Sequence, residues 1–209
     1  MAKSNQPAPE SPHRRPDISA HRRAQIAEAA LRCLKRDGYA RLTARRVAEE
    51  AGLSLGHLTY HFRDMAEVLA EAYLHVSRQL QEATDSGMGA SPAMPRDQLL
   101  AFLRAGFEAP FLQPDYLRLR VDLWSAARTD PAIARTEHAL YDRYRDQLCA
   151  LLEACAPAAH QPDIRATSDV IMAMLDGLWL DWLRRGNPVA IAAGLDAAIG
   201  LADRLSSKD

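Results

Sequence analysis

The sequence predicts an all-α protein of about nine helices, because both its composition and its apolar spacing favour helix. Alanine, leucine and arginine dominate while β-branched residues are sparse, and this mixture stabilises helix better than strand. Glycines and prolines fall mostly between segments whose apolar residues recur every three or four positions, which is the spacing of one helix face. The chain has 209 residues and 48% hydrophobic content, enough to bury a substantial core. We therefore expect a globular chain without a sheet.

Membrane-spanning and secreted proteins have features that this sequence lacks. The most apolar run, residues 170–183, contains Asp176 and Asp181 and is shorter than the roughly 18 residues that a membrane-spanning helix needs. The N-terminal residues lack the apolar core of a secretory signal. The three cysteines show no C-x-x-C spacing and lie within helical patterns, as buried thiols do in a reducing compartment. We expect a cytoplasmic protein without a disulfide, a zinc site or a membrane partner.

The first expected elements are a flexible arm and a long helix. Residues 1–17 contain four prolines among mostly polar neighbours and carry Arg14 and Arg15, which is typical of a flexible segment. The first helix is expected to start near Ser19 as its N-cap and to end at Gly38, with apolar residues at helical spacing between them.

Two short helices follow, with a tight turn between them. Thr43 is expected to cap a helix over residues 44–51, and Gly52 ends it because glycine accepts the left-handed backbone conformation common at helix C-termini. Ser54 is expected to cap a third helix of about two turns, whose apolar residues lie four apart on its inner side. Two short helices joined by such a turn form a helix-turn-helix.

The outer side of the third helix is unusual for a helix that only packs against a core. Gly56 lowers helix stability there by roughly 1 kcal/mol relative to alanine, so its presence suggests that a partner approaches the backbone closely. The other residues left facing outward are Leu55, His57, Thr59, Tyr60 and His61. This face is expected to contact a partner.

The remaining segments predict six more helices. Asp64 is expected to cap a long fourth helix with one apolar stripe, and residues 86–95 are expected to form a linker because they contain glycine, serine and proline. Proline and glycine breaks separate the others, which are expected at residues 96–109, 113–129, 131–155, 163–185 and 188–205.

Charge is divided unevenly along the chain. Residues 1–63 carry 12 Lys and Arg against 6 Asp and Glu, whereas residues 64–209 carry 14 against 21, although the whole chain has a net charge of −1. A basic unit attracts phosphates through its local charge and not through the net charge of the chain. The division modestly favours nucleic acid as a partner of the N-terminal unit, since segments of this size often differ by several charges.

Residues 20–64 resemble the DNA-binding unit of the TetR family of bacterial transcriptional regulators. The resemblance rests on the helix RRAQIAEAALRCLKRDGYA and on LTARRVAEEAGLSLGHLTYHFRD after it, with the family's spacing intact. It implies a homodimeric, ligand-responsive repressor that binds a palindromic DNA operator, with half-sites about one helical turn apart. Residues 18–64 are then the DNA-binding domain and residues 65–209 the effector-binding and dimerisation domain. Thr59 and Met65 depart from the family, which often has tyrosine and lysine there.

The helix-turn-helix residues divide into expected base contacts and expected phosphate contacts, because base edges specify sequence whereas phosphates hold the protein in register. Expected at base edges are Leu55, His57 and Thr59, with Gly56 allowing close approach. Expected near phosphates are Thr43, Arg45, Arg46, Ser54, Tyr60, His61 and Arg63. Arg22 and Arg23 of the first helix, with Arg14 and Arg15 of the arm, are expected to add backbone or minor-groove contacts. Each arginine pair, taken alone, also fits a solvated helix face.

Enzymatic and metal-dependent functions find little support. His57 and His61 are four residues apart, as in H-E-x-x-H, but no glutamate lies between them and no third ligand is apparent. Neither a G-x-S-x-G elbow nor a glycine-rich phosphate loop is present. We therefore expect no enzyme, no cofactor and no metal. The alternative function from another class is a helical small-molecule or partner-binding protein whose helix-turn-helix has lost specific DNA binding.

The last two helices are expected to form the dimer interface. Their apolar surface is wider than one core face requires, and small residues on the last helix permit close helix approach. The candidate interface residues are Met174, Leu178, Trp182, Ile191, Leu195 and Ile199. The alternative is that these helices pack only within one chain.

Aromatic side chains gather in the C-terminal helices together with aspartates. Aromatic faces and carboxylates suit a quaternary ammonium ligand, which binds through cation–π interactions and charge, although aromatics of this kind more often form ordinary cores. The candidate ligand-binding residues are Trp124, Tyr141, Tyr144, Asp176 and Trp179. Residues 118–206 are similar to the C-terminal domain of the choline-responsive, BetI-like repressors of betaine synthesis within the TetR family, which implies a related small-molecule effector.

Overall fold

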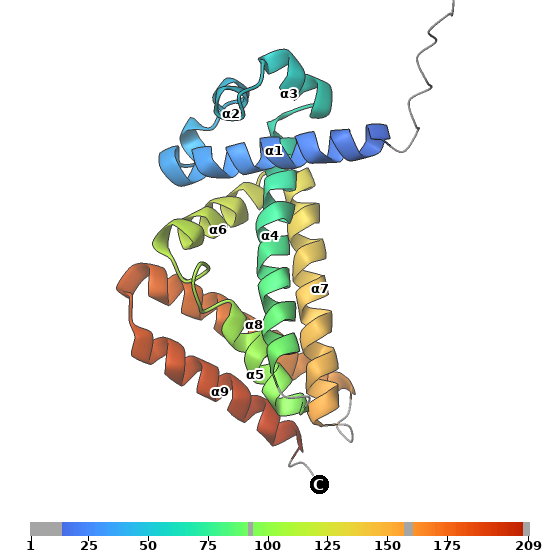
Figure 1. Cartoon of the computed structure of the whole chain (residues 1–209). Helices are drawn as coiled ribbons and strands as arrows, with labels where there is room; N and C mark the ends of the chain where they lie inside the picture. The colour runs from blue at the N-terminus through green and yellow to red at the C-terminus, as the bar shows by residue number, and fades with distance from the viewer. Residues whose placement is uncertain (1–13, 92–93, 157–160, 207–209) are drawn as a thin grey trace, which may run out of the picture.

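The computed structural model describes residues 14–91, 94–156 and 161–206, and within these ranges it contains helices and no strand (Figure 1). The all-α prediction is therefore confirmed. No helix of these ranges is long and apolar enough to span a membrane. The elements are α1 (Arg14–Asp37), the short 3-10 helix η1 (Tyr39–Arg41), α2 (Ala44–Glu50), α3 (Leu55–His61), α4 (Met65–Ala90), α5 (Pro95–Ala105), α6 (Pro114–Ala127), α7 (Pro131–Cys155), α8 (Gln161–Arg185) and α9 (Pro188–Ser206).

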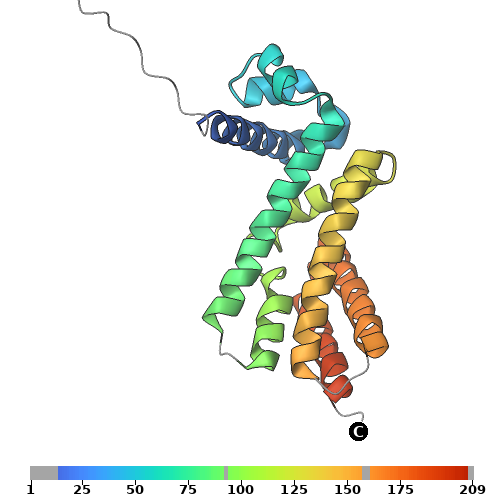
Figure 2. The same cartoon turned by 90° about the vertical axis from the view of Figure 1, so that its right-hand side faces the viewer.

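Two units of the molecule share the long helix α4. Helices α1, α2 and α3 group at one end, where α1 lies across the start of α4 (Figure 1). From there α4 runs beside α7 toward the opposite end, where α5, α8 and α9 complete the larger unit (Figure 2). Because α4 packs against α1 as well as against α5 and α7, a movement of α4 affects both units.

The inner side of α4 follows the predicted apolar spacing. Val68, Ala72, Val76 and Leu80 are all buried, and Tyr73 is buried beside them. Burial of a large apolar side chain stabilises a fold by about 1.5–3 kcal/mol. Apolar packing therefore fixes α4 against the larger unit along most of its length.

The predicted helix boundaries around the helix-turn-helix are confirmed in detail. Side-chain oxygens of Thr43, Ser54 and Asp64 each accept a hydrogen bond from the backbone N–H three residues later, which satisfies a donor that has no partner within the helix. Gly38 and Gly52 have φ angles of 75° and 67°, the left-handed region that glycine enters without steric cost. The turn between α2 and α3 thus has the predicted chemistry.

The start of the first helix differs from the prediction. Helix α1 begins at Arg14, so Ser19 lies inside it and does not cap it, and the last four residues of the expected arm are helical. The reason is that Pro16 lies in the first turn, where backbone N–H groups have no intrahelical acceptor and proline loses nothing. Residues 1–13 of the expected arm lie outside the described residues.

The expected linker over residues 86–95 is also wrong in its first half, because α4 continues to Ala90. A tertiary contact explains the extension. The side-chain amide of Gln98, on α5, donates to the carbonyls of Met88 at 2.9 Å and Ser91 at 3.3 Å. These carbonyls belong to the end of α4, so α5 supplies the partners that the end of a helix otherwise lacks. Helices α5 to α9 begin and end within four residues of the predicted bounds.

Candidate nucleic-acid interface and small-molecule pocket

Helix α3 has one buried side and one open side. Leu58, in α3, and Phe62, which caps its C-terminus, are each only 2% exposed and fix the helix against the core. On the other side Leu55 is exposed and Tyr60 is 84% exposed, an unusual position for a large ring. A Cβ added at Gly56 would meet only the Ser54 hydroxyl, at 3.8 Å. The fold itself therefore does not need glycine at this position, and the space in front of it is free.

The polar groups of α3 are ordered by contacts within the helix. The Ser54 hydroxyl accepts a hydrogen bond from the backbone N–H of His57 and lies 3.0 Å from Nδ1 of its ring. The Thr59 hydroxyl donates to the carbonyl of Gly56 at 3.2 Å. The pKa of His61 is lowered by partial burial and by nearby positive charge, first of all that of Arg23. The outward face thus combines oriented hydroxyls, phenol and imidazole rings, and one open backbone position.

Several arginines surround this face and remain free to change partner. Arg45 and Arg63 have side chains 84% and 87% exposed, and each pairs with a glutamate four residues later. Arg46 pairs with Asp37 at 3.4 Å, and Arg22 donates to the side chain of Gln25. Exposed pairs of this kind contribute only about 0–1 kcal/mol. A phosphate can therefore replace the present partners at little cost.

Arg23 has a different role from the predicted DNA contact. Its guanidinium donates to the backbone carbonyl of His61 at 2.6 Å and pairs with Glu67 at 3.1 Å and Glu71 at 3.0 Å. It also lies 4.1 Å from the centroid of the Phe62 ring. These contacts occupy the side chain within the protein and tie α1 to the end of α3 and the start of α4. The prediction for Arg23 is therefore corrected, because it positions α3 and does not face outward.

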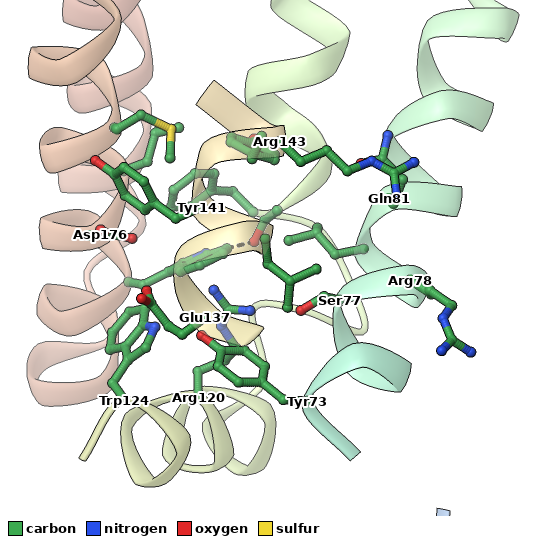
Figure 3. Close-up of a pocket in the computed structure, with 18 residues that line it drawn as sticks. Tyr73, Ser77, Arg78, Gln81, Arg120, Trp124, Glu137, Tyr141, Arg143 and Asp176 are labelled. Atoms are coloured by element: carbon green, nitrogen blue, oxygen red, sulfur yellow. Dashed lines mark hydrogen bonds between the residues drawn. The ribbon is translucent and has the colours of Figure 1, made fainter. Parts of the chain in front are cut away.

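A cavity of about 100 Å³ lies in the larger unit, between α4, α6, α7 and α8 (Figure 3). All five residues that the sequence singled out as ligand-binding candidates line it: Trp124, Tyr141, Tyr144, Asp176 and Trp179. The sequence reasoning missed other lining residues, among them Tyr73, Ser77, Arg120 and Glu137. The fold thus brings side chains from four helices around one space.

Arg120 is the central charged group of this cavity. Its Cζ atom lies 5.4 Å from the ring centroid of Tyr73, 5.4 Å from that of Trp124 and 5.1 Å from that of Trp179. Its Nε is buried without a hydrogen-bond acceptor among the described residues. The available signal in the sequence was the spacing of Tyr116, Arg120 and Trp124, which are four residues apart and place one arginine on the inner side of α6.

Two carboxylates also line the cavity, on helices facing Arg120. Asp176 lies on α8 and Glu137 on α7 (Figure 3). Burial raises the pKa of Asp176 to about 6, although the charge of Arg120 acts in the opposite direction. Removal of a carboxylate from water disfavours its charged form, and the charge of Arg120, which forms no ion pair with Asp176, offsets this effect only in part.

Trp179 reaches the cavity because Gly106 leaves room for it. The indole N–H donates to the carbonyl of Gly106 at 2.8 Å, and a Cβ at Gly106 would lie 2.9 Å from Cζ2 of the ring. A side chain at Gly106 would therefore displace the indole. The ring of Phe107 lies 5.9 Å from that of Trp179 and supports it from the same segment.

All six predicted dimer residues pack against the chain's own core, although to different degrees. Ile191 and Ile199 are buried within the chain, and Leu178 packs so closely on Gly194 that a Cβ there would lie 2.6 Å from it. Met174, Trp182 and Leu195 are partly buried against the core. The two isoleucines therefore belong to the chain's own core, which corrects their assignment to an interface.

The open side of α8 carries small and apolar residues that were not among the predicted interface residues. Ala173 and Gly177 are exposed, and Val170 and Leu180 are exposed large hydrophobic residues on the same stripe, three and four positions apart. Val189, at the start of α9, is 72% exposed. An apolar stripe of this length on a helix surface is typical of an association site. The signal in the sequence was the small residues at helical spacing.

Two known family profiles match this chain. A profile described as the BetI-type transcriptional repressor, C-terminal, matches residues 95–205, and the profile of the bacterial regulatory proteins of the tetR family matches residues 26–72. The chain is similar to the HTH-type transcriptional regulator BetI of Burkholderia cenocepacia (strain HI2424), with 30% identity over 188 residues, 90% of this chain and 95% of that protein. The protein of the same name from Paraburkholderia xenovorans (strain LB400) is 31% identical over 85% of this chain and 89% of its own length.

Solved structures resemble the fold along most of its length. A candidate transcriptional regulator from Pseudomonas aeruginosa PAO1 superposes with a TM-score of 0.78 and 29% identity, covering 90% of this chain and 92% of its own. A candidate transcriptional regulator from Saccharomonospora viridis, in complex with choline, superposes with a TM-score of 0.70, covering 90% of this chain and 97% of its own. At 20% identity the second likeness concerns the fold alone.

Proposed function

Because this chain belongs to the TetR family of bacterial regulatory proteins and carries a BetI-type C-terminal domain, we propose that it represses transcription as a homodimer that a small molecule releases from a palindromic operator. It is a DNA-binding transcriptional regulator and not an enzyme. The observation that carries the repressor proposal is the open face of α3, where polar and aromatic side chains surround Gly56 and no neighbour among the described residues requires a glycine.

In this proposal residues 18–64 are the DNA-binding domain and α3 enters the major groove. Leu55, His57 and Thr59 contact base edges, and Gly56 lets the DNA backbone or a base approach the helix closely. The phosphates meet the capping hydroxyls, the outward rings and the exposed arginines around α3: Thr43, Arg45, Arg46, Ser54, Tyr60, His61, Arg63 and Arg22. Arg23 supports these contacts by holding the end of α3 against α1 and α4.

Residues 65–209 form the effector-binding and dimerisation domain in the same proposal. Two copies pair through the open stripe of α8, which contains Val170, Ala173, Gly177 and Leu180, together with the exposed side of α9. Small residues let the helices of the two subunits approach closely, and the two-fold symmetry of the pair matches a palindromic operator.

The cavity between α4, α6, α7 and α8 is the proposed effector site. Its walls include Tyr73 of α4 and Arg120 of α6, and both helices also pack against α1 of the DNA-binding domain. An effector that shifts either helix therefore changes the position of α3, and in the dimer it changes the spacing of the two α3 helices. The effector must bind more tightly to the state in which the spacing of the two α3 helices does not match the operator. Equal affinity for both states would leave the equilibrium between them unchanged.

A quaternary ammonium effector is the class that the aromatic residues suggested, and one related fold was solved in complex with choline. The aromatic rings and the two carboxylates that line the cavity favour a cation. The position of Arg120 argues against it, because a positive charge already lies among the rings.

The test is a fluorescence-anisotropy titration of the purified protein against the DNA that flanks its own gene, with scrambled DNA of equal length, over a salt series. The repressor proposal predicts tight, salt-sensitive preference for the native fragment. The variant His57→Ala is expected to reduce the preference between the two fragments by about tenfold, the worth of one lost base contact. Equal, weak binding of both fragments would instead support a helix-turn-helix that no longer reads sequence.

A further inference from the structure

We propose that the effector of this protein carries a carboxylate, and that Arg120 binds this group inside the cavity between α4, α6, α7 and α8. The inference rests on the proposed effector-responsive function and names the chemical class of the effector. Figure 3 shows Arg120 pointing from α6 into the space between Tyr73, Trp124 and Glu137, at the centre of the lining residues.

Arg120 occupies the place that a ligand cation would need. Its guanidinium lies 5.1–5.4 Å from the ring centroids of Tyr73, Trp124 and Trp179, within the range of cation–π attraction. Arginine stays protonated in proteins, so these rings hold a permanent positive charge. A second cation placed among them would meet that charge in a site largely removed from water, where charges interact strongly.

The guanidinium also lacks the partners that its charge requires. It forms no ion pair with any described carboxylate, and its Nε is buried without an acceptor in this part of the chain. A buried donor without a partner destabilises the site, because the hydrogen bond it made in water is not replaced. A planar carboxylate corrects this deficit well, because its two oxygens accept two parallel N–H donors of a guanidinium. The Ser77 hydroxyl, also without a partner among the described residues, supplies one further donor at the cavity wall.

The carboxylates of Asp176 and Glu137 leave room for such a ligand. Neither side chain reaches Arg120 closely enough for an ion pair, and both attract its charge only from a distance. Asp176 repels an incoming anion while it is ionised, but burial already favours its neutral form and raises its pKa to about 6. An anionic ligand therefore needs to raise the pKa of Asp176 only modestly further to bind beside the protonated carboxyl. This carboxyl can then donate a hydrogen bond to the ligand.

The rest of the cavity sets the size of the ligand. The apolar wall includes Leu140 of α7, Met172 of α8 and the face of Trp179. The cavity of about 100 Å³ is somewhat smaller than the roughly 150 Å³ cavity known to hold benzene. The ligand is therefore a compact monocarboxylate with a small apolar body.

Four compounds of nearly equal shape test this class by isothermal titration calorimetry on the full chain without DNA. Choline carries only a quaternary ammonium, the anion of tert-butylacetic acid only a carboxylate, glycine betaine both groups, and neohexanol neither. We expect each carboxylate compound to bind about tenfold or more tightly than its alcohol counterpart, the strength of one charge-assisted pair. Alcohol counterparts that bind as tightly as the carboxylates, or no binding of any compound, would overturn the proposal.

Two variants with a matched control assign the effect to Arg120. Arg120→Met removes the charge and keeps an apolar stem, and it should abolish the preference for carboxylates. Arg118→Met removes the same charge from an exposed position of the same helix, where Arg118 pairs only with Asp115, and it should leave the affinities unchanged. An equal loss in both variants, or an unchanged preference in Arg120→Met, contradicts the assignment.

Asp176→Asn keeps the test decisive even if Arg120→Met does not fold. Removal of this negative charge should tighten binding of the carboxylates several-fold, whereas a site for a quaternary ammonium would lose affinity for choline. Weaker binding of the carboxylates by Asp176→Asn, together with a loss of choline affinity, therefore overturns the proposal. Anisotropy with operator DNA on the same preparations separates the two levels, because a chain that binds its operator but no carboxylate refutes only the effector class.

Discussion

The buried carboxyl of Asp176 should destabilise the protein at neutral pH, and Asp176→Asn should remove this cost. The pKa of this carboxyl rises from its ordinary value of 3.8 to about 6, mainly because the cavity removes it from water. A shift of this size corresponds to about 3 kcal/mol, at about 1.4 kcal/mol for each pKa unit. Since Asp176 stays partly accessible through the cavity, we expect the variant to be more stable by about 1–2 kcal/mol at pH 7.5.

The sign of the pH dependence follows from the direction of the shift. The folded-state pKa lies above the unfolded one, so folding favours the protonated carboxyl. Below pH 3.8 the carboxyl of Asp176 is protonated in both the folded and the unfolded state, so it does not lower the free energy of unfolding. As the pH rises through about 6 this free energy falls, because the folded state holds the proton more tightly than the unfolded state. Asparagine does not titrate. The difference between variant and wild type should therefore be largest above pH 7 and should disappear near pH 4.

Urea unfolding followed by circular dichroism, at one fixed protomer concentration, measures this difference at pH 7.5, 6 and 4. Asp142→Asn serves as the control, because Asp142 is 59% exposed on α7 and pairs only at the surface with Arg145. The control should change the free energy of unfolding by less than about 0.5 kcal/mol. An Asp176→Asn protein that is no more stable than the wild type at pH 7.5, or a gain that persists unchanged at pH 4, would refute the reasoning.

Three further predictions concern the other sites. Arg45→Ala combined with Arg46→Ala should weaken binding to operator and to scrambled DNA alike. It should also lower the slope of log affinity against log salt concentration by about one for each lost phosphate contact, and an unchanged slope in anisotropy would exclude those contacts. Gly106→Ala should push Trp179 from the cavity wall, shift its fluorescence and cost about 1–3 kcal/mol of stability, whereas an unaltered spectrum would show that the wall adapts. Leu180→Glu should weaken the proposed dimer by at least about tenfold in sedimentation velocity, and a dimer that persists at low concentration would move the interface away from this stripe of α8.

The proposed coupling between the DNA-binding face and the cavity depends on α4 and α6, which both pack against α1. Arg23 holds the end of α3 and the start of α4, whereas Arg120 of α6 lies against Tyr73 further along α4. Both arginines thus act on the same long helix, one from the DNA-binding domain and one from the cavity. In the proposed mechanism, an effector that draws Arg120 toward its carboxylate would change the support of α4 and, through Arg23, the position of α3.

Local chemistry explains which elements were predictable from the sequence. Thr43, Ser54 and Asp64 cap their helices through contacts over three residues, and Gly52 turns the chain through its own backbone freedom. Interactions over so short a distance depend on the order of residues and little else. The expected linker failed for the opposite reason, since Gln98 caps the end of α4 from another helix.

The sequence by itself determined the all-α class, the helix-turn-helix and the five aromatic and acidic residues that line the cavity, because helix periodicity decides which side of a helix faces inward. Only the tertiary structure decided what each inward group meets. It turned Arg23 from an expected DNA contact into an internal tie, placed Ile191 and Ile199 in the core, and set Arg120 among three rings without an ion pair. Periodicity specifies the direction of a side chain, but its partner depends on how helices distant in sequence pack, and the energy of a charge depends on that partner.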